Sequence, residues 1–391
     1  MLASAAFPVA PLRDAVTLGD APGATLRLTV SHVATAPFSD LADAVSLLTV
    51  RQHVAFLLTI LLAFVAWRVI RKKARASVGR RAGAEALAGG GLLLGVLAFY
   101  AAAVLMSRPM AALGLADADE LAADFHTHTR YSHDGRAGLT PRRVRAWHRA
   151  AGYDVAYVTD HRTLAGAAEA LETNPARAGE GTSLFSGIEL ISGKLHLNVL
   201  GAAPADSPHF RLRVLGPDSV GRFRPADGSD AVILLTIPGD LHRVRPAMRI
   251  GAVEVSDAAP RGLEQTQAEH AEIVRLADTA NLALLAASDN HGWGQTAAAW
   301  SVLRVPGWRD LPPPALDRAI RRKLATERRA AARAVERRRP DLADSPLGIA
   351  GTAPQMLWLM LRTLSWPERA SWLAWTWAAW GAAELLRRRR G

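Results

Sequence analysis

Two long apolar runs stand in the first third of the chain. Residues 86–106 contain no charge over 21 positions, about the length that a helix needs to cross the hydrocarbon core of a bilayer. Residues 54–67 form a second apolar run, and a helix there can continue to Ile70 because Arg68 can snorkel. We predict a transmembrane hairpin over 51–107, with spans at about 54–70 and 86–106. A buried core helix is the alternative for the second span.

The stretch 118–306 has a different pattern, in which short apolar runs alternate with helical patterns. Such alternation is typical of strands joined by helices in a layered α/β unit or an α/β barrel. We therefore expect one soluble domain over these residues, with most of its strands parallel. The predicted strands are Tyr153–Val158, Ser183–Ile188, Leu195–Leu200, Ala231–Thr236, Ala252–Val255 and Asn281–Ala287.

A basic segment follows this domain. Residues 318–339 carry ten basic and two acidic side chains. Apolar residues recur at Leu316, Ile320 and Leu324, which predicts a helix with one apolar stripe, and we assign 312–340 as a basic linker helix. A surface helix on anionic lipid and a nucleic-acid contact are the alternatives.

The C-terminal segment, 354–391, is rich in tryptophan and ends in a run of arginines. It holds six of the eleven tryptophans, and residues 370–383 are apolar. A third membrane crossing and a helix lying in the membrane interface both fit this pattern, because tryptophan favours the headgroup layer. We assign the segment to the membrane and leave these two arrangements open.

Composition and charge narrow the function classes. The chain has 391 residues, 50% of them hydrophobic, a net charge of +11 and no cysteine. It is too apolar for a mainly disordered protein, and it has no disulfide, thiolate metal site or cysteine nucleophile. The basic loop 68–81 favours the cytoplasm, which would place the soluble domain outside. We expect a multi-pass protein of a bacterial inner membrane, and we assign no role to residues 1–50.

Metal-binding side chains stand where the predicted strands end. His126 and His128 are two residues apart, so in an extended segment they project to the same side. Imidazole and carboxylate groups at the ends of successive strands are typical of the active-site rim of an α/β barrel. The other side chains at such ends are Asp160, His161, Glu189, His196, Asp289 and His291.

The run HTHTRYSHDG, followed by VTDH, GIE, an isolated His and SDNH, resembles the PHP (polymerase and histidinol phosphatase) superfamily. The resemblance covers about 122–305. It implies an α/β fold with a distorted (βα)7 TIM-like barrel, and hydrolysis of phosphate esters by two or three divalent metal ions. The ions would be Zn, Mn or Fe, since the ligand types do not choose among these.

The resemblance also implies roles for individual residues. His126, His128, Glu189 and Asp289 would bind one metal, and Glu189 would bridge to a second metal bound by His196. A third would be held by His161 and His291 with either His133 or Asp134. The implied catalytic residues are Asp160, His161 and Asp289. Asp124, Asp160, His242 and Glu254 would support the ligands, and Arg130, Arg162, Lys194 and Asn290 would bind substrate.

One position departs from the family pattern. A His-Pro pair often follows the fifth strand of the family, and its His binds the second metal. Here the chain has Ile237 before Pro238, and isoleucine offers no ligand atom. His242, five residues beyond, is the candidate replacement.

The expected function is a membrane-anchored, metal-dependent phosphoesterase that acts on a phosphomonoester or phosphodiester. The expected partners are a small phosphate ester or a nucleotide-like substrate and the lipid bilayer. Fold resemblance does not fix the substrate. The alternatives are a catalytically impaired, membrane-tethered module that binds metal or phosphate, and a nucleic-acid-associated protein.

Overall fold

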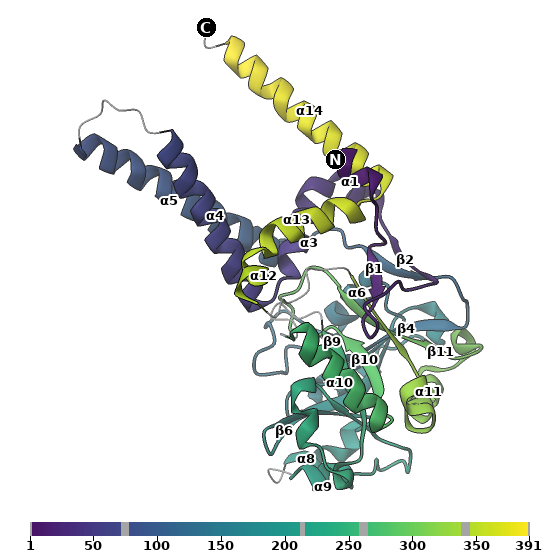
Figure 1. Cartoon of the computed structure of the whole chain (residues 1–391). Helices are drawn as coiled ribbons and strands as arrows, with labels where there is room; N and C mark the ends of the chain where they lie inside the picture. Colours follow the sequence, from purple (N-terminus) through teal and green to yellow (C-terminus); the bar gives the residue numbers. More distant parts are fainter. Residues whose placement is uncertain (1, 72–77, 212–215, 258–264, 338–344, 390–391) are drawn as a thin grey trace.

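The computed structural model describes residues 2–71, 78–211, 216–257, 265–337 and 345–389. A strand-rich unit forms the larger part, and long helices project from one end of it (Figure 1). The helices are α1 (Leu2–Ala6), α2 (Val30–Ala34), α3 (Ala36–Ser46), α4 (Val50–Ile70), α5 (Val78–Leu105), α6 (Pro141–Ala151), α7 (Ala165–Leu171), α8 (Ser207–Arg211), α9 (Pro217–Gly221), α10 (Gln267–Thr279), α11 (Pro313–Glu327), α12 (Pro346–Ala350), α13 (Thr352–Thr363) and α14 (Trp366–Arg388).

Ten strands form one mixed sheet in the order β1-β12-β11-β4-β5-β6-β7-β8-β9-β10, and β2 pairs with β3 in a separate ribbon. Parallel pairs join β4 to β5, β5 to β6, β8 to β9 and β9 to β10. The strands are β1 (Leu12–Asp14), β2 (Ala24–Arg27), β3 (Ala112–Leu115), β4 (Glu120–Thr127), β5 (Val155–Val158), β6 (Ser183–Ser192), β7 (Leu195–Leu200), β8 (Val232–Leu235), β9 (Ile250–Asp257), β10 (Ala283–Ala287), β11 (Ala299–Arg304) and β12 (Arg333–Arg337).

The distorted (βα)7 barrel expected from the resemblance is wrong. The sheet is an open, curled half-barrel, and β7 runs antiparallel to both of its neighbours. The backbone of β11 is already paired antiparallel with β4 and β12, so it offers no regular ladder to β10. The side chain of Ser301 instead bonds the backbone N–H and C=O of Ala286.

The six strands predicted from short apolar runs are confirmed as β5 to β10. Their side chains are almost all buried on both faces, because helices and loops cover both sides of the sheet. One face packs against α11, whose Leu316, Ile320 and Leu324 are fully buried. The apolar stripe predicted in the basic segment therefore belongs to the core.

The single basic linker helix over 312–340 is wrong beyond Glu327. A strand, β12, begins at Arg333 and inserts between β1 and β11. Ala334, Val335 and Glu336 are buried there, so this part of the basic stretch is covered on both faces of the sheet. Residues 338–340 of the predicted linker lie outside the described part.

Two helices of the described part are long and apolar enough to cross a membrane, α4 over Val50–Ile70 and α5 over Ala82–Leu105. They lie side by side and project together from the strand-rich unit (Figure 1), joined by the ion pair of Arg68 with Glu85 at 2.8 Å. By length and composition alone this is weak evidence for a membrane, and α14 does not meet the same criterion. Residues 72–77 of the basic loop lie outside the described part.

The first fifty residues build part of the fold. Strand β1 pairs antiparallel with β12 at the sheet edge, and β2 pairs with β3 just after the α5 helix. Helices α2 and α3 pack near α13 and α14 at the end from which the long helices project (Figure 1). The two ends of the chain therefore meet in this region.

Candidate metal centre

The sheet brings the predicted metal-binding residues together at one edge. His126 is the last residue but one of β4, His128 follows the end of the strand directly, and β6 carries Glu189. The loop after β10 carries Asp289 and folds back onto β4, because the Asp289 N–H donates to the His126 carbonyl and the His128 N–H donates to that of Asn290. The backbone at Asp289 has a φ of 43°, a left-handed conformation that few non-glycine residues adopt and that often marks functional sites.

Two imidazole nitrogens and two carboxylate oxygens lie close together here, and we call these four atoms the first set. His126 Nε2 lies 3.0 Å from His128 Nε2 and 3.0 Å from Glu189 Oε2. Asp289 Oδ1 lies 3.2 Å from both imidazole nitrogens, and it has no hydrogen bond within the described residues. His126, His128 and Glu189 are almost completely buried.

The hydrogen bonds of the two rings direct their lone pairs into the first set. The His126 Nδ1–H donates to Glu254 at 2.9 Å. The His128 Nδ1–H donates to the Ser132 hydroxyl at 3.2 Å, because that hydroxyl itself donates to Asp134. In neutral rings both Nε2 atoms would be acceptors that face two carboxylate oxygens. The group therefore attracts positive charge, either as protons on the two rings, whose pKa values the neighbouring carboxylates raise, or as a metal ion.

The spacing fits a divalent metal ion. Ligand atoms about 2.1 Å from a metal are separated by about 3.0 Å in octahedral geometry and about 3.4 Å in tetrahedral geometry. In the first set the two imidazole nitrogens lie 3.0 Å apart and 3.0 to 3.3 Å from the Glu189 and Asp289 oxygens, and the ligand atoms of His126, His128 and Asp289 all lie within 4.8 Å of one another. The nitrogen and oxygen donors also match borderline ions such as zinc, manganese and iron.

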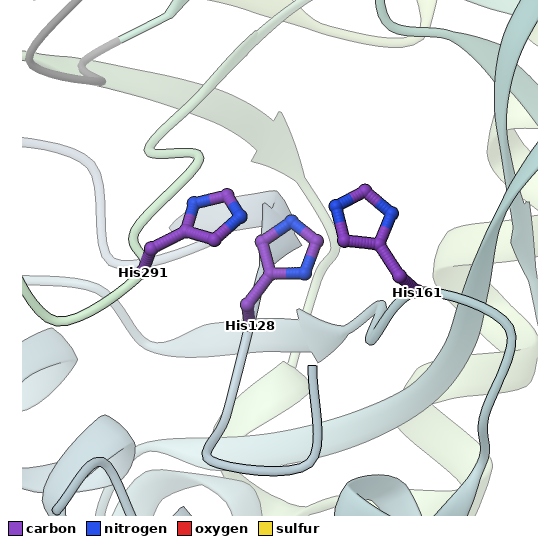
Figure 2. Close-up of side chains that lie close together, drawn as sticks. All are labelled: His128, His161 and His291. Carbon is purple, nitrogen blue, oxygen red and sulfur yellow. The ribbon is translucent and has the colours of Figure 1, made fainter. Parts of the chain in front are cut away.

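A second set of ligand atoms lies beside the first. Asp134 Oδ2 lies 3.4 Å from His161 Nε2 and 3.3 Å from His291 Nε2. The His291 ring is held by its Nδ1–H, which donates to the Asp289 carbonyl, and its buried Nε2 has no hydrogen bond within the described residues. The rings of His291, His128 and His161 lie in a row, with His128 stacked between the other two (Figure 2).

Of His133 and Asp134, the two candidates for the ligand beside His161 and His291, Asp134 lies close to both rings. The His133 side chain is 76% exposed, and its Nδ1 lies 4.0 Å from Asp134 Oδ1. Asp134 is instead close to both imidazoles of the second set. His133 can still reach a position near His161, since these two and Asp134 form a group with ligand atoms within 4.8 Å of one another.

The metal position that the resemblance assigns to Glu189 and His196 has fewer ligands than the other two. His196 Nδ1 lies 3.0 Å from Glu189 Oε1, so these two residues meet as expected. Ile237 provides no ligand atom beside Glu189 and His196. His242, the candidate replacement, does not supply one either. His242 is exposed, and its ring bonds to the Gly239 carbonyl in its own turn. Among the described residues, three overlapping groups have all their ligand atoms within 4.8 Å of one another: His126, His128 and Asp289; His128, His161 and His291; and His133, Asp134 and His161.

Glu254 and Asp124 support the ligands. Glu254, on β9, is buried and fixes the His126 ring. Asp124 accepts from the backbone N–H groups of His126 and Ser288 and from the Ser288 hydroxyl, which ties the end of β4 to the loop that carries Asp289.

Asp160 differs from its expected role. Its carboxylate accepts from the backbone N–H and the hydroxyl of Thr129 at 2.6 and 2.7 Å, so it holds the loop after β4 rather than the ring of His161. Within the described residues, the hydrogen bonds of the Asp160 carboxylate therefore go to Thr129 and not to the His161 ring, and a catalytic role for Asp160 stays a prediction. Gly166 leaves room for this clamp, because a Cβ there would clash with the Asp160 carboxylate and the Thr129 hydroxyl.

The charges of the two sets are strongly coupled to their surroundings. Burial tends to raise the pKa of Asp289, but His126 and His128 outweigh it and hold the pKa at about 2. Burial lowers the pKa of His161 and of His291, which keeps these rings neutral near pH 7, the form that binds a metal. Burial raises the pKa of Glu254 to about 8.

The four residues expected to bind substrate do not gather around the ligand sets. Arg130 is paired with Glu169 at 3.0 Å. Arg162 and Lys194 are exposed and have positive φ angles. Asn290 is buried and accepts from the Gly292 N–H, and its side-chain nitrogen has no hydrogen bond within the described residues, so it alone of the four is aimed into the protein near the ligands.

Two residues at the site were missed from the sequence. His148, on α6, is fully buried with its Nε2 2.7 Å from Asp124, and Ser132 joins His128 to Asp134. The spacing of Val144 and His148, four residues apart on the buried face of α6, was the available signal for His148. Ser132 gave no signal, because its role depends on how the loop folds.

No protein-family model matches the chain, and no curated protein matches it. Solved structures that resemble its fold include PsfC from Pseudomonas syringae, with 18% identity, a TM-score of 0.37, and coverage of 61% of this chain and 98% of that one. A two-domain protein from Bacteroides vulgatus that contains a predicted PHP-like metal-dependent phosphoesterase has 16% identity, a TM-score of 0.35, and coverage of 60% and 70%.

A third structure with a related fold is the lesion-specific endonuclease PfuEndoQ from Pyrococcus furiosus. It has 13% identity and a TM-score of 0.36, and the match covers 53% of this chain and 56% of that one. At these values the likeness assigns no activity to the chain, so the functional argument rests on the residues of the site.

Proposed function

We propose that the chain is a metal-dependent hydrolase of phosphate esters, with its active centre at the edge of the sheet where β4, β6 and the loop after β10 meet. The observation that carries the proposal is that His126 Nε2 and His128 Nε2 lie 3.0 Å apart and 3.0 to 3.3 Å from the Glu189 and Asp289 oxygens. The second set, Asp134, His161 and His291, lies against the first and would hold a second ion.

Paired divalent ions activate a bound water near neutral pH and neutralise the charge that develops in phosphoryl displacement. The protein residues hold this centre in a fixed geometry. Glu254 keeps the His126 lone pair directed at the first set, and Ser132 does the same for His128. Such support is worth about 10- to 100-fold in metal affinity or activity.

The finer parts of the proposal are the substrate and the location. The substrate would be a phosphomonoester or a phosphodiester. The helices α4 and α5 would anchor the enzyme in a bacterial inner membrane, with the 118–306 domain on the extracytoplasmic side. The nucleic-acid alternative rests on the basic side chains of α11, of which Arg321 is buried in an ion pair with Asp317, whereas Arg318 and Arg322 are exposed.

The test is hydrolysis of p-nitrophenyl phosphate and bis(p-nitrophenyl) phosphate by the full chain in detergent, after loading with zinc, manganese or iron. We expect activity with at least one metal, and a loss of about 10³-fold or more in Asp289→Asn, since water activation requires the intact ligand set. His209→Ala is the control, because His209 is exposed and distant in sequence from both sets.

The metal- or phosphate-binding module remains the competing function because the third ligand position is incomplete. It predicts tight metal binding without turnover of either ester. Hydrolysis that is equal in wild type and Asp289→Asn would contradict the proposed enzyme.

A further inference from the structure

A second group of metal-binding residues lies at the other end of the fold, where helices α2, α3 and α14 meet. It consists of His32, Asp40 and Glu368, which we call the His32 triad. All three side chains are buried, with exposed fractions of 0%, 4% and 6%. His32 Nε2 lies 3.5 Å from Asp40 Oδ1 and 3.4 Å from Glu368 Oε1. The three ligand atoms lie within 4.8 Å of one another.

The outer atoms of the triad are held by hydrogen bonds. His32 Nδ1 lies 3.1 Å from the Pro109 carbonyl. The Trp372 indole N–H donates to Asp40 Oδ2 at 2.8 Å, and the Ser365 backbone N–H donates to Glu368 Oε2 at 2.7 Å. Partners of this kind orient the ligands of protein metal sites. They leave Nε2, Oδ1 and Oε1 facing one another.

The atom at the centre of the triad lacks a hydrogen bond. A carbonyl oxygen only accepts, so His32 Nδ1 carries a hydrogen, and Nε2 of the neutral ring then points a lone pair at two carboxylate oxygens. Within the described residues this buried Nε2 has no hydrogen bond. A cation is needed between these three atoms.

A proton on Nε2 satisfies the triad poorly. Charge-assisted N–H···O bonds are normally about 2.7–2.9 Å long, shorter than the 3.4 and 3.5 Å seen here. A protonated triad also keeps a net charge of −1, whereas a divalent ion with neutral His32 makes it neutral.

We propose that the His32 triad binds one divalent transition-metal ion of the zinc type, at a structural site separate from the centre on the sheet edge. One imidazole and two carboxylates are donors that such an ion accepts. A cavity of about 270 Å³ is lined by Asp40 and Glu368, though not by His32, so it adjoins the two carboxylates of the triad. The ion would tie the N-terminal helices to α14, and so join the two ends of the chain.

The experiment uses the full chain in detergent, stripped with a chelator, dialysed against zinc and assayed for zinc per chain by elemental mass spectrometry. The decisive variant is Glu368→Gln. Glu368 is the third residue of a capping box with Ser365, a position where glutamine serves as well as glutamate, so this variant keeps the helix cap and removes a ligand charge. His32→Gln is the second variant.

Glu269→Gln is the matched control. Glu269 closes the same kind of capping box with Thr266 at the start of α10, but it is exposed and outside any group of ligands. We expect Glu368→Gln and His32→Gln each to carry one zinc ion fewer than wild type, and Glu269→Gln to carry the same number. Zinc should also raise the unfolding temperature of the two triad variants less than that of wild type.

Equal zinc content in wild type and Glu368→Gln, with unchanged helix content by circular dichroism, would overturn the proposal. If His32→Gln does not fold, Glu368→Gln decides alone. The result is independent of the sheet-edge centre, because Asp289→Asn removes ions only there. If the double variant Glu368→Gln/Asp289→Asn loses as much zinc per chain as the two single variants together, the result would support two separate sites.

Discussion

Replacing Glu254 with glutamine should weaken metal binding while it stabilises the metal-free protein. Glu254 is 1% exposed, and its carboxylate accepts from His126 Nδ1 at 2.9 Å. A hydrogen bond to a charged group contributes about 1.5–3 kcal/mol and a neutral one about 0.5–1.5 kcal/mol. The difference, about 1–1.5 kcal/mol, corresponds to about a tenfold loss of affinity at the first set, with about 100-fold as the upper bound for such support.

The pH dependence of stability determines whether Glu254→Gln stabilises or destabilises the metal-free protein. Burial raises the pKa of Glu254 to about 8, above its ordinary value of 4.5. The folded protein therefore binds a proton that the unfolded chain has lost, and stability falls as the pH rises from 4.5 to 8. Glu254→Gln removes this fall, so its unfolding temperature without metal should exceed that of wild type above pH 8. The loss of metal affinity should also be largest there, where the wild-type carboxylate is ionised.

The assay is a zinc competition titration with a chromogenic chelator at pH 6.5 and pH 8.5, beside thermal unfolding in excess chelator. Glu272→Gln is the control, because Glu272 lies on the surface of α10 in an ion pair with Arg275. Unchanged zinc affinity in Glu254→Gln at pH 8.5 would refute the claim that Glu254 fixes the His126 ring for metal binding.

Three further predictions concern one position beside the centre and two elsewhere in the fold. Gly166→Ala should break the clamp between Asp160 and Thr129 and lower both the unfolding temperature and the zinc affinity; a fully active variant with the wild-type melting temperature would contradict this role. Ile320→Ala should cost about 2–5 kcal/mol of unfolding free energy by denaturant titration, because Ile320 is fully buried, whereas a solvated linker helix predicts almost no change. Burial raises the pKa of the half-buried Asp154 to about 6. The unfolding free energy of Asp154→Asn should therefore gain about 1–2 kcal/mol relative to wild type as the pH rises from 4 to 7. A difference in thermal unfolding that does not depend on pH would argue against this.

The sequence predicts the strands and the strand-end ligands well because both depend on local patterns. Short apolar runs mark β5 to β10, and each ligand follows or lies within such a run. Whether the sheet closes depends on strands that are far apart in the sequence. Because β11 pairs with β12, the backbone N–H and C=O groups of β11 that β10 would have used are already hydrogen-bonded. The strand β12 was missed because its RAVER sequence lies within a basic run that also fits a helix.

Sequence patterns also could not predict which residues far apart in the chain contact one another at the site. Asp160 was expected to orient its sequence neighbour His161, but the fold brings the Thr129 loop closer to its carboxylate. The His32 triad joins residues from both ends of the chain. His32 and Glu368 lie in segments whose packing the sequence pattern did not predict, so nothing marked them as a pair.

The central claim is that the sheet edge binds two metal ions through the first and second ligand sets. The most direct measurement is metal per chain in the full-length protein, loaded and purified in detergent, compared with the double variant His126→Ala/His161→Ala. The account predicts a loss of two ions in the double variant, with the fold retained by circular dichroism. Equal metal content in the two proteins would contradict it.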